Sequence, residues 1–185
     1  MSYQRTDLFN PIGFVRGASP FVEVSWVIVK NLFFLSAWPW PSSFKACLLR
    51  LFGADVGCCL YLRPRTNIHF PWKLRIGNHC WIGDRCEILN LEFVTLEDNV
   101  ALAHDVYLAA ASHDIRSVSM KYKNLPITIC RGTWVATRVF VGPGVVVGEN
   151  CVLGAGTIVT QDVADDTILI PSPPVIVGKR CFTYD

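Results

Sequence analysis

Aliphatic residues recur every six positions over much of the chain, with short skips between groups of three. The positions that follow this beat are Val56, Leu62, Ile68, Ile76, Ile82, Ile88, Leu96, Leu102, Leu108, Ile129, Val135, Val141, Val147, Leu153 and Val159. A strand alternates every two residues and a helix about every 3.6, so neither produces a six-residue period. We therefore predict a solenoid, in which each unit is a short strand plus a corner and three units make one triangular coil.

The residue that follows each aliphatic position is usually small. The small residues are Gly57, Gly77, Gly83, Ala103, Ala109, Cys130, Ala136, Gly142, Gly148 and Gly154. A sharp bend in the backbone leaves little room for a side chain, which favours such residues at the corners. The aliphatic residue before each corner is expected to point inward and to stack on its counterpart in the next coil.

These patterns divide the chain into three parts. Residues 1–55 are expected to form an N-terminal helical segment, residues 56–163 the β-helix, and residues 164–185 a short C-terminal tail. Within the β-helix, residues 113–128 have no aliphatic beat. We interpret them as an inserted loop, and a long loop that leaves a regular scaffold is a candidate for function.

Two segments of the N-terminal part have the character of helices. Residues 21–40 are strongly apolar, but Glu23 and Lys30 interrupt them, which disfavours a membrane-spanning helix. We expect an amphipathic helix that packs on the body of the protein; the alternative is that it rests on a membrane surface. Residues 44–52 are predicted to form a second helix that ends at Gly53.

Composition narrows the class of protein further. The chain has 185 residues, of which 51% are hydrophobic and 17% charged, so large interfaces between subunits would account for the apolar surplus. The net charge is only +2 and the basic residues are scattered, which excludes nucleic acid as an expected partner. Residues 1–10 are polar and unlike a secretory signal, so a cytoplasmic protein is expected.

The eight cysteines and four histidines do not have the spacing of a metal site. There is no Cys-x-x-Cys pair and no His at zinc spacing, so we expect no metal. Cys80, Cys86 and Cys151 occupy repeat positions that favour a small buried side chain, as free thiols in a reducing compartment. His69, His79 and His104 are interpreted as structural residues.

Several motifs resemble the hexapeptide-repeat acyltransferases, and most closely the group that acetylates colanic acid, which is related to galactoside and maltose acetyltransferases. The matching motifs are Leu48-Leu49-Arg50-Leu51-Phe52-Gly53-Ala54, Pro71-Trp72-Lys73-Leu74-Arg75-Ile76-Gly77, Ser112-His113-Asp114, Pro126-Ile127-Thr128-Ile129, Trp134-Val135-Ala136, Val141-Gly142-Pro143-Gly144-Val145 and 152–163. This resemblance implies a left-handed parallel β-helix, a homotrimer and an O-acetyltransferase that uses acetyl-CoA. The acceptor would be a saccharide or a lipid-linked sugar. The expected location is the cytoplasm, with peripheral contact to the inner face of the membrane through residues 21–40 as the alternative.

The resemblance also implies the catalytic residues. His113 corresponds to the family's catalytic base, a role that suits an imidazole because its pKa lies near neutrality. Asp114 is expected to orient this imidazole or to contact the acceptor. Asn90, Tyr122 and Lys123 are the candidate acceptor contacts.

The donor site follows from the same resemblance, in a groove between neighbouring subunits. Its expected members are Trp134, Ala136, Thr137, Ala155, Thr160, Lys179 and Arg180. The backbone N–H near Thr137 would stabilise the oxyanion, and the two basic residues would meet the CoA phosphates. The family's Gly-Asn-Pro-Ala segment is replaced here by Pro171-Ser172-Pro173-Pro174, which removes a backbone donor from the donor site.

Two other functions use the same fold. A γ-type carbonic anhydrase needs three His around zinc, and His104 and His113 are nine residues apart, on different sides of a coil. A non-catalytic β-helix scaffold is the second alternative, and the altered segment 171–174 is its best support.

Overall fold

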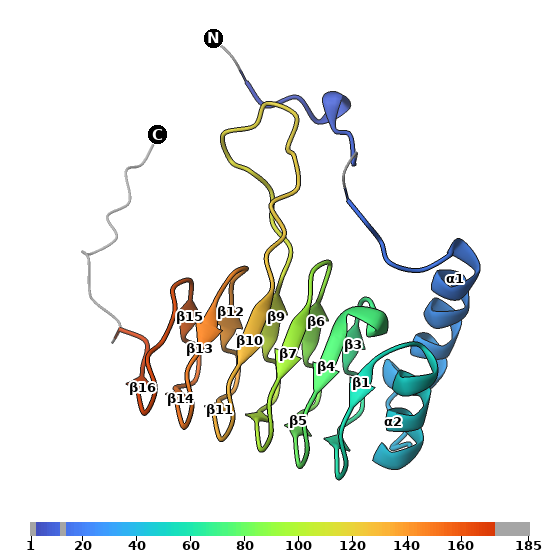
Figure 1. The fold of residues 1–185 in the computed structure, drawn as a ribbon, viewed down its shortest axis with the longest axis vertical. Coiled ribbons are helices and arrows are strands. Elements are labelled where there is room, and N and C mark those ends of the chain that lie inside the picture. The colour runs from blue at the N-terminus through green and yellow to red at the C-terminus, as the bar shows by residue number, and fades with distance from the viewer. Residues whose placement is uncertain (1–2, 12–13, 173–185) are drawn as a thin grey trace, which may run out of the picture.

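In a computed structural model, the protein is a prism of three parallel sheets (Figure 1). The structure describes residues 3–11 and 14–172. Sheet A contains β1 (Asp55–Val56), β4 (Leu74–Ile76), β7 (Val94–Leu96), β10 (Ile127–Ile129) and β13 (Val146–Val147). Sheet B contains β2 (Tyr61–Leu62), β5 (Trp81–Ile82), β8 (Ala101–Leu102), β11 (Trp134–Val135), β14 (Val152–Leu153) and β16 (Ile168–Leu169). Sheet C contains β3 (Asn67–Ile68), β6 (Glu87–Leu89), β9 (Tyr107–Ala109), β12 (Phe140–Val141) and β15 (Ile158–Val159). The predicted parallel β-helix with N-terminal helices is confirmed.

The aliphatic beat forms the core of the prism. Val56 pairs with Ile76 and Ile76 with Leu96 on sheet A, so equivalent residues of successive coils stack directly. All fifteen aliphatic positions are buried. Because parallel pairing in register repeats the same contact in every coil, one ladder of aliphatic side chains lines each face from within. Cys80, Cys86 and Cys151 are buried free thiols, as the repeat predicted.

The coils differ in length at one corner only. On sheet B, Leu62 pairs with Ile82, Ile82 with Leu102, Leu102 with Val135, Val135 with Leu153 and Leu153 with Leu169. Successive coils therefore contain 20, 20, 33, 18 and 16 residues, whereas three six-residue units would give 18. Every departure from 18 falls where the chain passes from sheet C to sheet A, which we call the C–A corner.

The longest departure is the inserted loop, which rises from the C–A corner between β9 and β10 (Figure 1). It spans residues 110–126, so Ile127 and Thr128, which were expected in the loop, belong to β10. At the other end of the solenoid, β16 lies beyond residue 163 and extends sheet B into the segment expected to be a tail.

The N-terminal helices begin and end at residues that favour those positions. In α1 (Pro20–Val29), Ser19 is the N-cap, its Oγ accepting from Val22 N–H at 3.4 Å, and Pro20 follows at the first helical position. The helix continues as a π-turn over Lys30–Phe34. The second helix, α2 (Ser42–Leu51), has Phe52 as its C-cap and is followed by Gly53, whose φ of 90° is open to glycine but strained for other residues.

These helices cover the first coil and satisfy its outward-facing carbonyl groups. The carbonyls of Val56, Leu62 and Ile68, one in each sheet, point away from the second coil. The donors are Arg50 Nε to Val56 O at 2.9 Å, Lys45 Nζ to Leu62 O, and Trp26 Nε1 to Ile68 O at 3.0 Å. Ser42 Oγ accepts from the Leu62 N–H at 3.0 Å. The open edge of each sheet is thereby closed by a side chain rather than by another strand.

The opposite face of α1 is apolar and exposed. Trp26 and Phe34 are buried in the core, whereas Phe21, Val24 and Ile28 are exposed on the other side of the helix. Among the described residues, no helix is both long enough and apolar enough to cross a bilayer.

Candidate active site

The inserted loop is a narrow antiparallel excursion that holds His113 opposite Tyr122. These two residues form a β-bridge. Asp114 N–H donates to Lys121 O at 2.8 Å, and Lys123 N–H donates to Ser112 O at 2.8 Å. These bonds on either side of the bridge fix the backbone of His113, although the loop lies outside the coils.

The imidazole of His113 is oriented by a backbone carbonyl. Its Nδ1 lies 2.6 Å from Met120 O. A carbonyl oxygen can only accept, so Nδ1 carries the proton and Nε2 of the neutral ring presents a lone pair. The ring of Tyr122 stacks on the imidazole with centroids 5.0 Å apart. His113 is half-buried, and this arrangement suits a general base that accepts a proton at Nε2.

Asp114 does not orient this imidazole, contrary to one of its two expected roles. Its Oδ1 accepts a hydrogen bond from the Arg116 N–H at 2.9 Å, closing a turn at the loop. The carbonyl of Met120 occupies the Nδ1 side of His113 instead. A main-chain oxygen leaves no side-chain signature, which is why the sequence did not reveal this partner.

A cavity of about 550 Å³ opens beside His113, and we call it the loop cavity. Its lining residues are Ser112, His113, Asp114, Ile115, Arg116, Lys123, Leu125 and Pro143. Three predicted site residues, His113, Asp114 and Lys123, therefore share one cavity. The mixture of basic, acidic and apolar side chains gives both hydrogen-bonding and packing partners to a ligand.

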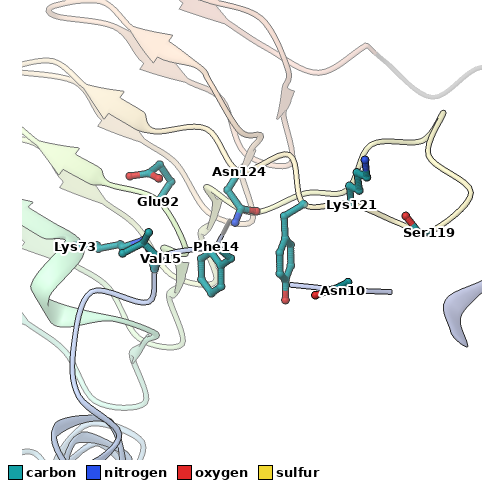
Figure 2. Close-up of a pocket in the computed structure, with 9 residues that line it drawn as sticks. Asn10, Phe14, Val15, Lys73, Glu92, Ser119, Lys121 and Asn124 are labelled. Atoms are coloured by element: carbon teal, nitrogen blue, oxygen red, sulfur yellow. Dashed lines mark hydrogen bonds between the residues drawn. The ribbon is translucent and has the colours of Figure 1, made fainter. Parts of the chain in front are cut away.

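A second cavity, of about 650 Å³, lies along the C–A corner and is called the corner cavity (Figure 2). Successive corners each contribute to it: Lys73 from the second coil, Glu92 from the third, and the inserted loop from the fourth. The loop residues in its lining are Ser119, Lys121, Tyr122 and Asn124, and the N-terminal arm adds Asn10, Phe14 and Val15. The predicted residue Tyr122 stands between the two cavities, since its ring contacts His113 of the loop cavity.

Lys73 lines the corner cavity, and hydrogen bonds fix its side chain. Its Nζ donates to Val15 O at 2.7 Å and to Leu91 O at 2.6 Å, and it lies 5.1 Å from the centroid of the Phe14 ring. Burial lowers the pKa of this ammonium group. Since its donors are occupied by carbonyls, Lys73 holds the arm against the corner.

The N-terminal arm, residues 3–11 and 14–19, also contacts the loop. Phe9 lies edge-on to both His113 and Tyr122, with centroids 5.9 Å and 5.2 Å away. Arg5 N–H donates to Val118 O at 2.8 Å. These contacts support the catalytic candidate from outside the solenoid. In the sequence, the sign of these contacts is the presence of two aromatic residues, Phe9 and Phe14, in a largely polar stretch.

Asn90 is a structural residue, which corrects its expected role in acceptor binding. Its side chain is fully buried between coils. Its Oδ1 accepts from Phe70 N–H at 2.9 Å, and its Nδ2 donates to Phe70 O and Lys73 O at 2.6 and 3.1 Å. The amide has no group left for a substrate. It instead replaces the strand pairing where the chain turns at the C–A corner.

The predicted donor residues lie away from His113. Trp134, 52% exposed, lies on sheet B, the face opposite the C–A corner, in a cavity of about 340 Å³ with Tyr61 and Trp81. Ala136 is buried, and its N–H donates to Leu153 O at 2.8 Å. Within a single chain, sheet B and the loop therefore cannot form one site.

The remaining predicted donor residues that the structure describes lie along the last coils of the solenoid. Thr137 is half-buried and its carbonyl accepts from Gly156 N–H at 2.9 Å, next to the exposed Ala155. Thr160 lines a separate cavity of about 320 Å³. Lys179, Arg180 and residues 173–174 of the altered segment lie outside the described residues.

The two histidines considered for a carbonic anhydrase, His104 and His113, lie at different corners of the prism. His104 Nδ1 accepts from Asp84 N–H at 3.0 Å at the corner between sheets B and C. His113 lies on the loop at the C–A corner. In the part of the chain that the structure describes, no three histidines converge on one point.

Comparison with known proteins gives consistent matches. The family model described as bacterial transferase hexapeptide (six repeats) matches residues 126–161, and that described as hexapeptide repeat of succinyl-transferase matches residues 73–110. The putative colanic acid biosynthesis acetyltransferase WcaF of Escherichia coli K12 is 34% identical over 176 residues, 94% of each chain.

Solved structures share the fold. A hexapeptide-repeat acetyltransferase from Vibrio cholerae, in complex with acetyl coenzyme A, superposes with a TM-score of 0.76 at 21% identity, over 93% of this chain and 95% of that one. A galactoside acetyltransferase in complex with coenzyme A has a TM-score of 0.74 at 25% identity, over 82% of this chain and 77% of that one.

Proposed function

The chain belongs to the hexapeptide-repeat acetyltransferases, and from this premise we propose that it transfers an acetyl group from acetyl-CoA to a hydroxyl of a saccharide. The relatives named above support both substrates: one is assigned to colanic acid biosynthesis, and the galactoside acetyltransferase was solved with coenzyme A. The observation that carries the proposal is the 2.6 Å contact between His113 Nδ1 and Met120 O, which leaves Nε2 of the neutral imidazole to accept a proton.

The reaction proceeds by direct transfer. His113 Nε2 removes the proton of the acceptor hydroxyl while its oxygen attacks the thioester carbonyl. The C–S bond breaks, and the proton passes from His113 to the departing sulfur, which gives acetylated saccharide and CoA thiol. The backbone N–H of Thr137 is the proposed donor to the oxyanion.

The complete site forms between two protomers of a homotrimer. His113 lies at one corner of the prism, while the proposed donor-binding residues Trp134 and Ala136 lie on the opposite face. If the loop of one protomer faces sheet B of its neighbour, the thioester can reach His113. Ala155 and Thr160 would then flank the pantetheine arm, and Lys179 and Arg180 would meet the CoA phosphates.

The acceptor would occupy the two cavities around Tyr122. The reacting sugar lies in the loop cavity beside Asp114 and Lys123, and the rest of the saccharide extends into the corner cavity. The polar groups of Asn10, Glu92 and Asn124 suit a ligand rich in hydroxyls, because hydroxyls both donate and accept.

The test is release of CoA thiol from acetyl-CoA in the presence of candidate saccharides. His113→Ala should lower kcat by about 10²–10⁴-fold, the usual contribution of a positioned base. His79→Asn is the matched control, since the exposed His79 lies between sheets A and B, outside the loop and the cavity around Trp134, and asparagine tolerates its φ of 57°; this variant should keep the full rate. An unchanged rate in His113→Ala removes the proposed base.

We also propose that the enzyme is cytoplasmic and rests on the membrane through the apolar face of α1. Phe21, Val24 and Ile28 are exposed together, and an interfacial helix buries such a face among lipid headgroups. A lipid-linked acceptor would then be presented at the membrane. Flotation with anionic liposomes should recover the protein, and Phe21→Glu should abolish that recovery; equal recovery of both would contradict the contact.

A further inference from the structure

Two exposed cysteines and a histidine converge at the corner between sheets A and B. Among the described residues, three ligand atoms lie within 4.8 Å of one another: the Sγ of Cys58, the Sγ of Cys59 and one imidazole nitrogen of His79. All three side chains are exposed, and both thiols are free. This cluster lies outside the loop and donor faces, and the proposed reaction does not use it.

The coil repeat, rather than local spacing, brings these residues together. Cys59 and His79 are one 20-residue coil apart, at equivalent positions of stacked turns, and both have φ of 57°. His79 N–H donates to Cys58 O at 2.9 Å, and Cys58 N–H donates to Asn78 Oδ1 at 2.9 Å. The backbone that carries the three groups is therefore fixed across two coils.

We propose that Cys58, Cys59 and His79 bind a zinc ion. Thiolate and imidazole are the ligands that Zn²⁺ prefers, with Zn–S and Zn–N distances of about 2.3 and 2.0–2.1 Å. Tetrahedral bonds of those lengths separate the ligand atoms by about 3.6–3.8 Å. Side-chain rotations that move these atoms by about 1 Å therefore close the site around the ion. The backbone can remain where it is.

The site lies between two successive coils of the solenoid. Cys58 and Cys59 belong to the first coil and His79 to the second, so the ion links the two coils beside the N-terminal helices. The fourth coordination position faces solvent and takes a water molecule. The sequence predicted no metal because its cysteines and histidines lack the spacing of a zinc motif. The stacking of successive coils brings Cys58, Cys59 and His79 together although their spacing in the sequence does not match such a motif.

The test is binding of Zn²⁺ to the reduced full-length chain, followed by calorimetry, with Co²⁺ as a spectroscopic probe. One ion per chain should bind, and Co²⁺ should give thiolate-to-metal charge-transfer absorption. Cys58→Ser, Cys59→Ser and His79→Asn should each weaken binding by at least about tenfold, because loss of a group that merely supports a ligand already costs that much. Asparagine is chosen at 79 because it tolerates positive φ.

Cys47→Ser is the matched control, since Cys47 is an exposed free thiol outside the cluster, and it should bind Zn²⁺ like the unaltered chain. If a ligand variant does not fold, alkylation of the unaltered chain decides: Zn²⁺ should protect Cys58 and Cys59 from alkylation but leave Cys47 reactive. Absence of stoichiometric binding, equal binding by the ligand variants, or equal protection of Cys47 would overturn the proposal.

Discussion

A neutral carbonyl, rather than a carboxylate, orients the proposed base. The Met120 oxygen fixes the tautomer of His113, but it carries no full charge to stabilise an imidazolium. Asp114 Oδ1 accepts from the Arg116 N–H instead of from the imidazole. At the scale of single residues, orientation of His113 therefore depends on the path of the loop backbone and on the ring of Tyr122.

Asn90 allows a prediction about stability. Asn90→Ala leaves the buried Phe70 N–H and the Lys73 carbonyl without these partners, while the Phe70 carbonyl keeps the Lys73 N–H, and it should lower the free energy of unfolding by about 2–4 kcal/mol. Denaturant unfolding at fixed protein concentration measures this. Asn67→Ala, which removes a half-buried amide that donates to Glu87, should cost less than Asn90→Ala. The KM for the acceptor should not change in Asn90→Ala; a selective rise would restore Asn90 to the acceptor site.

The family resemblance singled out His113, and the position of the inserted loop singled out Tyr122 and Lys123. His113 and Tyr122 are side by side, and Lys123 shares the cavity with His113. Asn90 misled because a buried amide and a ligand-binding amide look alike in a sequence. The partner of His113 was invisible because any residue at position 120 has a carbonyl.

At the scale of elements, α1 and α2 act as a cap for the first coil. One donor side chain reaches each sheet, from Trp26, Lys45 and Arg50. Solenoids need such caps because an open strand edge pairs readily with another chain. The period of six predicted the coils, and Gly53 predicted the end of α2. The capping contacts were not predictable, because they join segments far apart without any period, and for the arm the only sign in the sequence was the two aromatic residues Phe9 and Phe14.

Lys45 provides a test of the cap that depends on pH. Burial lowers the pKa of Lys45 to about 8, while the unfolded chain keeps the ordinary value of about 10.4. Between these values the unfolded chain holds more protons, so this group's contribution to stability rises with pH. The neutral amine still has two N–H donors for Leu62 O and Arg63 O. The stability difference between the unaltered protein and Lys45→Met should therefore widen from pH 8 to pH 10.

The measurement is denaturant unfolding across that pH range, with Lys123→Met as the control because Lys123 is exposed on the loop. The control should show no such widening. A gap that stays constant or narrows for Lys45→Met would mean that Lys45 is charged and satisfied in the folded protein.

At the scale of the whole molecule, the proposed site needs two protomers, and mixed trimers can test this. His113→Ala and Trp134→Glu should each be inactive alone. In trimers co-assembled from equal amounts of the two, about one quarter of the interfaces should combine an intact His113 with an intact Trp134. Thiol release should recover to about a quarter of the unaltered rate. No recovery in verified mixed trimers would place the site within one chain.

The C–A corner has a consequence for how such proteins diversify. Coils of 16 to 33 residues coexist in one prism because every insertion or deletion is absorbed at a single edge, while the three sheets stay in register. That edge carries both cavities of the proposed acceptor site. We therefore expect substrate range to change through the short segments at this edge, the inserted loop above all, with no compensating change in the stacked interior.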